Sequence, residues 1–184
     1  LGDVYKRQAF DQYSKGLRRR RLDIIKNLSL DVREGEIMAI FGASGSGKSL
    51  LAAAILGLLP YNGFCEGEIL YKGKTLDENL LEKVRGREIF FIPQSITSLN
   101  SLLKTKDQAR MTMARKDYHK QRQVYQSFGL GIEVDDMYPR ELSGGMARRV
   151  LVSDAILSGA DFIIADEPTP GMDKEATDEI VSYF

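Results

Sequence analysis

The chain has 184 residues, and its 26 basic and 26 acidic side chains leave a formal net charge of zero. This balance and the 43% hydrophobic content are ordinary for a globular protein and give no electrostatic reason to expect a nucleic-acid partner. The single cysteine, Cys65, excludes an intramolecular disulfide framework and is interpreted as small apolar filler, while the longest apolar run, residues 50–59, is too short to span a bilayer.

The first residues read as a processing segment. The string DVYKRQ (residues 3–8) can be back-translated into a transposase adapter used for sequencing libraries. We therefore interpret residues 1–8 as a scar at the end of a gene fragment and leave them out of the expected fold. The alternative is a native strand with this sequence. No signal peptide is indicated, so any membrane connection would come through a partner.

The next segments alternate between strand and helix patterns. Residues 28–32 alternate apolar and polar side chains, residues 33–35 predict a turn, and the apolar run EIMAIF (36–41) predicts a buried strand that ends at Gly42. The helix formers of KSLLAAAILGLL predict a helix that stops at Pro60. This order of strand, glycine loop and helix is the one that a phosphate-binding loop requires.

The rest of the chain divides by its patterns. Lys72-Gly73 predicts a hairpin, EIFFIP (88–93) a short strand, and residues 98–139 an inserted helical lobe. Ser143 is expected to cap a helix that runs to about Ser158, with Gly159 in the left-handed conformation. DFIIAD (161–166) predicts a buried strand with acids at its carboxyl end.

A complete phosphate-loop pattern, G-x-x-x-x-G-K-[ST], occupies residues 42–49. Its nucleotide-binding candidates are Gly42, Ala43, Ser44, Gly45, Ser46, Gly47, Lys48 and Ser49, followed by Leu50. Glycines let backbone N–H groups turn toward an anion, and the helix N-terminus adds positive potential. Lys48 is expected to reach the β- and γ-phosphates of ATP, and Ser49 to ligate Mg²⁺.

Three further residues complete the expected chemistry. Asp166 stands at a strand end where it can hold Mg²⁺, directly or through water, and Glu167 can orient or deprotonate the attacking water. Gln94 follows a second strand, and its amide can ligate Mg²⁺ and report the position of the helical lobe. Glu167, Lys48 and Gln94 are thus the catalytic candidates, and Ser49, Gln94 and Asp166 the metal-ligand candidates.

With these motifs in order, the chain from Ala9 onward resembles the nucleotide-binding subunit of an ATP-binding cassette (ABC) transporter. The resemblance rests on the phosphate loop, Gln94, the signature LSGGM, the acidic strand end and PTPGMD at the position of the family's D-loop. The signature comprises Leu142, Ser143, Gly144, Gly145 and Met146. PQSITSLNSLLK and YPRELSGGMARR are similar to the branch that imports peptides or nickel.

The resemblance implies an α/β P-loop NTPase fold: a RecA-like core with an antiparallel β subdomain (9–97 and 140–184) and the inserted α-helical subdomain (98–139). It implies two ATP-binding subunits, identical or different, that pair head to tail so that each signature covers the partner's ATP. Two membrane permeases and, indirectly, a solute-binding protein would complete the importer. The chain would then act as an ATPase at the cytoplasmic face of the cell membrane.

The chain departs from the family pattern in four respects. The switch histidine is absent from these residues, and His119 reads as a solvated helix residue. Pro170-Gly171 replaces the usual small pair of the D-loop, and the helical lobe is short. The adenine-stacking aromatic is assigned to Tyr13, with Phe10 as the alternative and core packing as the plainer interpretation of both.

Other interpretations remain open at this point. A non-transport ABC ATPase or another transporter branch would use the same motifs, whereas LSGGM argues against a kinase or GTPase. The run Arg18–Arg21 is interpreted as a solvated loop, and the basic residues of the helical lobe as a solvated face rather than a nucleic-acid site. That basic set comprises Lys104, Lys106, Arg110, Arg115, Lys116, Lys120 and Arg122.

Overall fold

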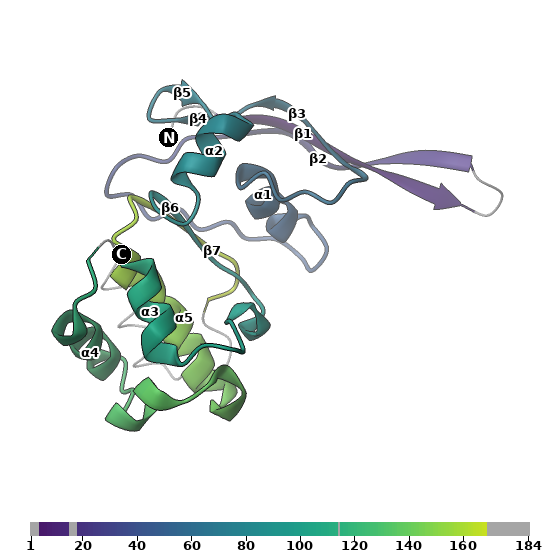
Figure 1. Cartoon of the computed structure of the whole chain (residues 1–184). Helices are drawn as coiled ribbons and strands as arrows, with labels where there is room; N and C mark the ends of the chain where they lie inside the picture. Colours follow the sequence, from purple (N-terminus) through teal and green to yellow (C-terminus); the bar gives the residue numbers. More distant parts are fainter. Residues whose placement is uncertain (1–3, 15–17, 114, 169–184) are drawn as a thin grey trace. The chain divides into compact units, whose positions relative to one another are not determined.

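A computed structural model of the chain describes residues 4–14, 18–113 and 115–168, and at residues 4–14, 18–24, 26 and 27 it describes the backbone alone. The chain divides into two compact units, residues 1–83 and 84–184, both drawn in Figure 1. The expected helical lobe, residues 98–139, lies inside the second unit, and its separation from a core stays a prediction.

The first unit is built on an antiparallel sheet with the strand order β2-β1-β3. Its elements are β1 (Val4–Ser14), β2 (Arg18–Leu30), α1 (Lys48–Ile55), β3 (Gly63–Glu68), β4 (Leu70–Tyr71), β5 (Lys74–Thr75) and α2 (Glu78–Val84), whose last residue opens the second unit. The central strand β1 pairs along its length with β2 and, from Tyr5 to Phe10, with β3 (Figure 1).

Three expectations about this sheet are corrected. Residues 4–8 belong to β1, where Tyr5 pairs with Glu68, so they cannot be left out of the fold; their origin as a scar stays a prediction. Arg18–Arg21 form the start of β2 rather than a loop, because pairing with residues 11–14 satisfies the backbone whatever the side-chain charge. Cys65 lies exposed in β3 and fills no core.

The apolar run at residues 36–41 does not form the predicted buried strand. The turn before it is present, since Glu36 N donates to Arg33 O at 3.1 Å and Gly35 has φ +72°. Residues 36–41, however, join no ladder, and Ile37 and Phe41 are 60% and 91% exposed. A buried strand needs a neighbour for its N–H and C=O groups, and no strand of the first unit's described residues pairs with this run.

Glycines decide two local boundaries in this unit. Helix α1 ends at Leu56 rather than continuing to Pro60, because Gly57 takes φ +64° and Leu58 N donates back to Ala53 O at 2.7 Å. This is a Schellman ending, which glycine favours. The predicted hairpin is confirmed: Lys72 and Gly73 both have positive φ between β4 and β5.

The second unit packs helices around one long central helix, α5. Its elements are β6 (Ile89–Ile92), η1 (Ile96–Ser98), α3 (Thr105–Thr112), α4 (Tyr118–Ser127), η2 (Ile132–Asp136), η3 (Pro139–Glu141), α5 (Gly144–Ser158) and β7 (Phe162–Ala165). Ser143 caps α5 and Gly159 ends it with φ +64°, both as predicted. The described part of residues 98–138 is helical without a strand, which confirms the pattern expected there.

The core of this unit lies between α3, α4, α5 and β6. Its fully buried members include Tyr125 and Phe128 of the α4 segment and Val150, Val152 and Ala155 of α5. Strand β6 pairs with β7 in parallel, Ile92 opposite Ala165. Strand β7 is half-buried to exposed rather than fully buried as predicted.

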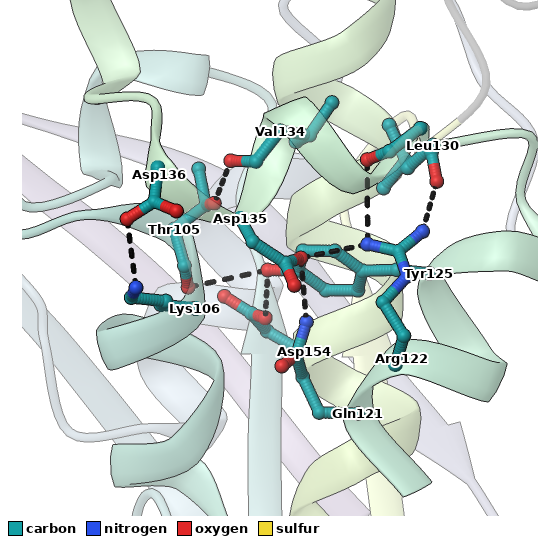
Figure 2. Close-up of polar contacts among 11 residues, drawn as sticks. Thr105, Lys106, Gln121, Arg122, Tyr125, Leu130, Val134, Asp135, Asp136 and Asp154 are labelled. Atoms are coloured by element: carbon teal, nitrogen blue, oxygen red, sulfur yellow. Dashed lines mark hydrogen bonds and ion pairs between the residues drawn. The ribbon is translucent and has the colours of Figure 1, made fainter. Parts of the chain in front are cut away.

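A polar network runs through the helical core (Figure 2). The Arg122 guanidinium donates to Asp135 Oδ1 at 2.7 Å, to Gly131 O at 3.3 Å and to Leu130 O, and Gln121 Nε2 donates to the same Asp135 oxygen at 3.0 Å. Asp135 is only 3% exposed. Arg122 is therefore an internal ion-pair partner and does not belong to a solvated face.

Tyr125 and Asp154 form a second, tighter part of the network. The Tyr125 hydroxyl lies 3.2 Å from Thr105 O and 3.4 Å from Asp154 Oδ1, so its one hydrogen is shared between the two acceptors. Burial raises the pKa of the Asp154 carboxyl well above its usual value, and the contact with Tyr125 offsets part of that rise. The central helix thus carries a carboxyl that favours its neutral form.

The surface of the helical region matches the expectation in other places. Lys104 and Lys106 both donate to the exposed Asp136, and these bonds lower the pKa of that carboxyl to about 2. His119 is exposed in the first turn of α4, as predicted for a solvated helix residue.

Candidate functional site

The phosphate loop at residues 42–49 leads directly into α1. Gly45 and Gly47 have φ +78° and +95°, values that side chains with a Cβ rarely adopt, and Ser46 N donates to Ala43 O at 3.1 Å. Gly47 caps α1 without a side-chain hydrogen bond. The first turn of the helix therefore keeps backbone donors for an anion, as the sequence predicts.

Close packing explains a further glycine of this loop. A Cβ placed on Gly42 would lie 2.6 Å from the Ser46 hydroxyl oxygen, closer than such atoms approach in proteins. A methyl group at this position would therefore force the Ser46 side chain to move.

Lys48 folds back over its own loop. Its ammonium donates to Gly42 O at 2.8 Å and to Ala43 O at 3.1 Å. Lysine carries three N–H donors, and phosphate oxygens are stronger acceptors than neutral carbonyls. The ammonium is thus held at the loop, where a phosphate could take over these bonds. Ser49 beside it is exposed, so its hydroxyl is accessible.

In the second unit, the ends of two parallel strands bring the other candidates together. Asp166 N donates to Ile92 O at 2.9 Å, which continues the ladder between β6 and β7 by one step. Parallel strands end at the same edge of their sheet, so Gln94 after β6 and Asp166-Glu167 after β7 share that edge. The sequence predicted each of these residues but not their meeting.

Gln94 and Glu167 are directly hydrogen-bonded. Gln94 Nε2 donates to Glu167 Oε2 at 2.6 Å across 73 positions of sequence. Glu167 has φ +48°, a left-handed conformation that is uncommon for a residue with a side chain and is often found at functional sites. Both side chains are exposed and Asp166 is half-buried. A carboxylate oriented by an amide in this way can accept a proton from a water molecule.

Arg148 is a residue of this site that the sequence did not reveal. It lies in α5 with 5% of its surface exposed, and its guanidinium donates to Pro93 O at 2.7 Å and to Gln94 O. In the sequence it is one of two adjacent arginines on a helix, which ordinarily indicates a solvated position. Its partners are 54 and 55 residues away, so no local pattern could identify it.

The signature residues form the start of α5. The Ser143 hydroxyl accepts from Met146 N at 3.2 Å, while Leu142 and Met146 pack partly buried against the core. A Cβ on Gly144 would meet no atom within 4 Å, so the space above this glycine is open. With its oxygen engaged as the cap, Ser143 still has an O–H to donate to an incoming ligand.

Some of the predicted residues lie beyond what can be placed. The side chains of Tyr13 and Phe10 are outside the described part of the chain, although both residues belong to β1. Pro170-Gly171 of the D-loop is outside it as well. The assignment of the adenine-stacking aromatic stays a prediction.

The predicted ligands suit Mg²⁺ by their chemistry. The described residues hold no cluster of three His, Cys, Asp or Glu side chains. Taken separately, Ser49 of the first unit and Gln94 and Asp166 of the second carry a hydroxyl, an amide and a carboxylate, which are the kinds of oxygen donor that Mg²⁺ takes alongside substrate phosphates. When bound, Mg²⁺ would supply charge neutralisation to the phosphates.

Comparisons of sequence find relatives whose names describe transport ATP-binding proteins. The oligopeptide transport ATP-binding protein OppD of Haemophilus influenzae is 36% identical over 174 residues, which is 87% of this chain and 54% of that protein. OppD of Lactococcus lactis subsp. cremoris is 40% identical over 165 residues, 81% of this chain and 48% of that protein. The chain thus spans about half the length of the curated relatives it matches.

Comparison of structures shows the fold. The ATP-binding cassette MJ0796, solved as a dimer in a post-hydrolysis state bound to ADP and Pi, aligns with a TM-score of 0.82 at 24% identity over 100% of this chain and 81% of its own. The predicted α/β P-loop NTPase fold is confirmed by this likeness. No helix among the described residues is long and apolar enough to cross a membrane.

A sequence profile with the description "ABC transporter" matches residues 25–170, from strand β2 through the phosphate loop and the signature to the segment after β7. This span contains the motifs described above, in the order that the sequence predicted. The chain belongs to the ABC transporter family.

Proposed function

We propose that the chain is the ATP-binding, ATP-hydrolysing part of a membrane importer. The observation that supports this proposal is that two helix starts in one chain each offer groups suited to a phosphate. The loop before α1 offers glycine-turned amides and Lys48, and the start of α5 offers the Ser143 hydroxyl beside the open Gly144. A single nucleotide bound at the phosphate loop does not also need the start of α5 from the same chain.

The two helix starts are accounted for by a head-to-tail pair of chains. In such a pair the phosphate loop of one chain and the signature of the other act on the same γ-phosphate. The dimeric cassette that resembles this chain supports an assembly of two. The two chains of such a pair can be identical or different.

The chemistry follows from the residues placed above. Phosphoryl transfer to water depends mainly on positioning and charge stabilisation. Lys48 and the loop amides hold the triphosphate, with Ser49, Gln94 and Asp166 as the residues that would hold Mg²⁺. Glu167, oriented by Gln94, takes the proton of the attacking water. The signature hydroxyl and amides of the partner stabilise the charge that develops on the γ-phosphate.

The transported solute is proposed to be a peptide. Several similar proteins carry names for oligopeptide, dipeptide or peptidoglycan transport. Nickel, the other solute that the sequence suggested, has no support of this kind in these names. The importer would comprise two permeases and a solute-binding protein, with this chain at the cytoplasmic face of the membrane.

A permease contact is proposed for the apolar hollow beside α3 and α5. Phe91, Leu99, Leu103, Met111 and Leu151 contribute to its lining. Among these lining residues, the Met111 side chain is 69% exposed. We expect Met111→Glu to abolish co-purification with the permeases, whereas Ile132→Glu, also on an exposed apolar side chain, should not. Equal loss in both variants would contradict this assignment of the surface.

Complementation tests the proposed function, using the protein in its full natural length. Ser143→Arg and Lys48→Ala are each expected to abolish ATP hydrolysis in a homodimer. In a mixture, a head-to-tail pair combines both lesions in one site and leaves the other site intact, so hydrolysis should return. A mixture as inactive as its components would mean either that both sites must act at once or that the signature does not serve the partner's ATP.

A second variant tests the assignment of the base. Glu167→Gln is expected to abolish turnover while ATP still binds and traps a closed dimer, which size-exclusion chromatography with ATP would detect. Unchanged hydrolysis would show that another group takes the proton. Side-by-side measurement of MgATP and MgGTP binding separates this proposal from a GTPase, because a clear preference for GTP would refute it.

A further inference from the structure

We propose that Arg148 is a positioning residue that holds the Gln94 turn and thereby orients Glu167, so that the signature helix and the hydrolytic glutamate act as one mechanical unit. This inference deepens the proposed function and rests on it. Arg148 touches neither the predicted base nor a reacting atom, and its effect passes through Gln94.

The first observation is the burial of the arginine. Arg148 is 5% exposed in α5, five positions after the Ser143 cap. Taking a guanidinium out of water is costly unless strong acceptors replace the water. The described surroundings provide two carbonyl oxygens for its terminal nitrogens, while its Nε finds no partner. An arginine held in this way has little freedom to do anything other than fix those two carbonyls.

The second observation is the identity of the carbonyls. They belong to Pro93 and Gln94, consecutive residues immediately after β6. A planar guanidinium that holds two successive carbonyls fixes the direction of the peptide between them, which a single point contact could not do. The direction of that peptide sets where the Gln94 side chain leaves the backbone.

The third observation is the contact at the far end. The Gln94 amide donates to Glu167 at 2.6 Å, and Glu167 has an uncommon backbone conformation with φ +48°. The Gln94 contact is thus a specific restraint on this exposed carboxylate. A hydrogen-bonded path therefore runs from α5 through Arg148 and Gln94 to Glu167.

The path has a consequence for assembly. The start of α5 is the part proposed to cover the partner's nucleotide, and Arg148 lies just over one turn into the same helix. A displacement of α5 when the partner binds would be transmitted to Gln94 and Glu167 of the chain that donates the signature. Arg148 would in this way couple one nucleotide site to the other.

The fold supplies a matched control for this arginine. Arg122 of α4 also donates to two successive carbonyls, Leu130 O and Gly131 O, and its side chain is 16% exposed. It belongs to the polar network around Asp135 and holds no residue of the candidate site. Arg148→Lys and Arg122→Lys each keep a positive charge but lose the planar guanidinium that donates to two successive carbonyl oxygens.

The first test needs no enzymatic activity. In ¹⁵N-labelled protein, Glu167→Gln should shift the side-chain amide resonance of Gln94, because the carboxylate acceptor is lost. That response should remain in the Arg122→Lys background and disappear in the Arg148→Met background. Arg148→Lys should reduce the shift of the Gln94 resonance. This variant replaces Arg148→Met in the test if Arg148→Met does not fold. A full response in the Arg148→Lys and Arg148→Met backgrounds would overturn the proposal.

The second test measures hydrolysis in the full-length protein. Removing a residue that orients a ligand costs about 10- to 100-fold in metal affinity or activity, so Arg148→Met should lower kcat and raise the Mg²⁺ requirement within that range. The KM for ATP should stay close to the parent value, because the phosphate loop is unchanged. Equal effects of Arg148→Lys and Arg122→Lys on kcat would overturn the proposal.

The two tests separate this inference from the proposed function. If the parent protein hydrolyses no ATP, the proposed function fails, and the resonance experiment still decides whether Arg148 orients Gln94. If hydrolysis is normal and Gln94 keeps its full response to Glu167→Gln without the Arg148 side chain, only the positioning role is refuted.

Discussion

The buried ion pair between Arg122 and Asp135 allows an asymmetric prediction about stability. Arg122→Met removes the main donor to Asp135 and leaves a carboxylate that is 3% exposed with Gln121 as its remaining donor (Figure 2). The Asp135 Oδ2 atom already has no partner. Breaking a buried pair by removing one member typically costs about 3–5 kcal/mol.

The reverse change should cost less. Asp135→Asn leaves Arg122 with the carbonyls of Leu130 and Gly131, and the arginine side chain is 16% exposed, so water can reach part of it. Its loss is one hydrogen bond to a charged group, about 1.5–3 kcal/mol. Arg122→Met should therefore destabilise the chain more than Asp135→Asn, although the two substitutions break the same pair.

Chemical denaturation followed by far-UV circular dichroism would measure the change in the free energy of unfolding for both variants, and a thermal scan with the same readout would measure the change in Tm. For a chain of this size, about 3–5 kcal/mol corresponds to a fall in Tm of about 6–20 °C. The exposed neighbour Asp136 provides the control, because Asp136→Asn breaks two ion pairs at the surface and should change the free energy of unfolding least of the three. The reasoning is refuted if Arg122→Met costs less than Asp135→Asn, or if Asp136→Asn costs as much as either.

Three further outcomes are expected. Ser143→Ala should lower the free energy of unfolding by about 1 kcal/mol, because the α5 cap is lost. Ser143→Asp should keep the cap and yet abolish hydrolysis, because its carboxylate repels the partner's phosphate. A stable, active Ser143→Asp dimer would argue against the assigned role. Because burial raises the pKa of Asp154, the folded chain retains a proton that the unfolded chain loses above about pH 4, so stability should fall as pH rises toward the raised pKa. Asp154→Asn should flatten that slope in urea titrations at several pH values, and an unchanged slope would assign it to other groups. Gly42→Ala should weaken binding of a fluorescent ATP analogue by about tenfold or more, because the added methyl group clashes with Ser46. Adding Ser46→Ala should restore part of the affinity. No recovery in the double variant would mean that the clash is not the cause.

Local backbone chemistry explains which elements the sequence could predict. The hairpin at Lys72-Gly73, the Ser143 cap and the Gly159 ending each depend on residues within a few positions of one another. Helix α1 shows the limit of that approach even at short range. The sequence predicts a stop at Pro60, but Gly57 ends the helix earlier because its left-handed conformation closes a Schellman motif.

The predictions that the structure corrects are mostly those that depend on a partner far away in the sequence. Residues 36–41 have the composition of a buried strand, but composition supplies no neighbour, and this run pairs with no strand among the described residues of its own unit. Arg18–Arg21 looked like a loop because of their charge, yet pairing with β1 makes them a strand. The charge of Arg122 also predicts a solvated position, but its guanidinium forms a buried ion pair with Asp135.

By itself, the sequence determined which residue types this protein brings to its candidate site: a phosphate-loop pattern, an acidic pair after one strand, a glutamine after another and a second glycine-rich helix start. These depend on residue types at fixed short spacings, which the covalent chain enforces. Tertiary structure alone decided which of them meet. Gln94 reaches Glu167, and Arg148 holds Gln94, because parallel strands bring their ends to one edge and α5 packs beside them. Such contacts join residues more than fifty positions apart, and packing of the whole unit, rather than any local pattern, sets them.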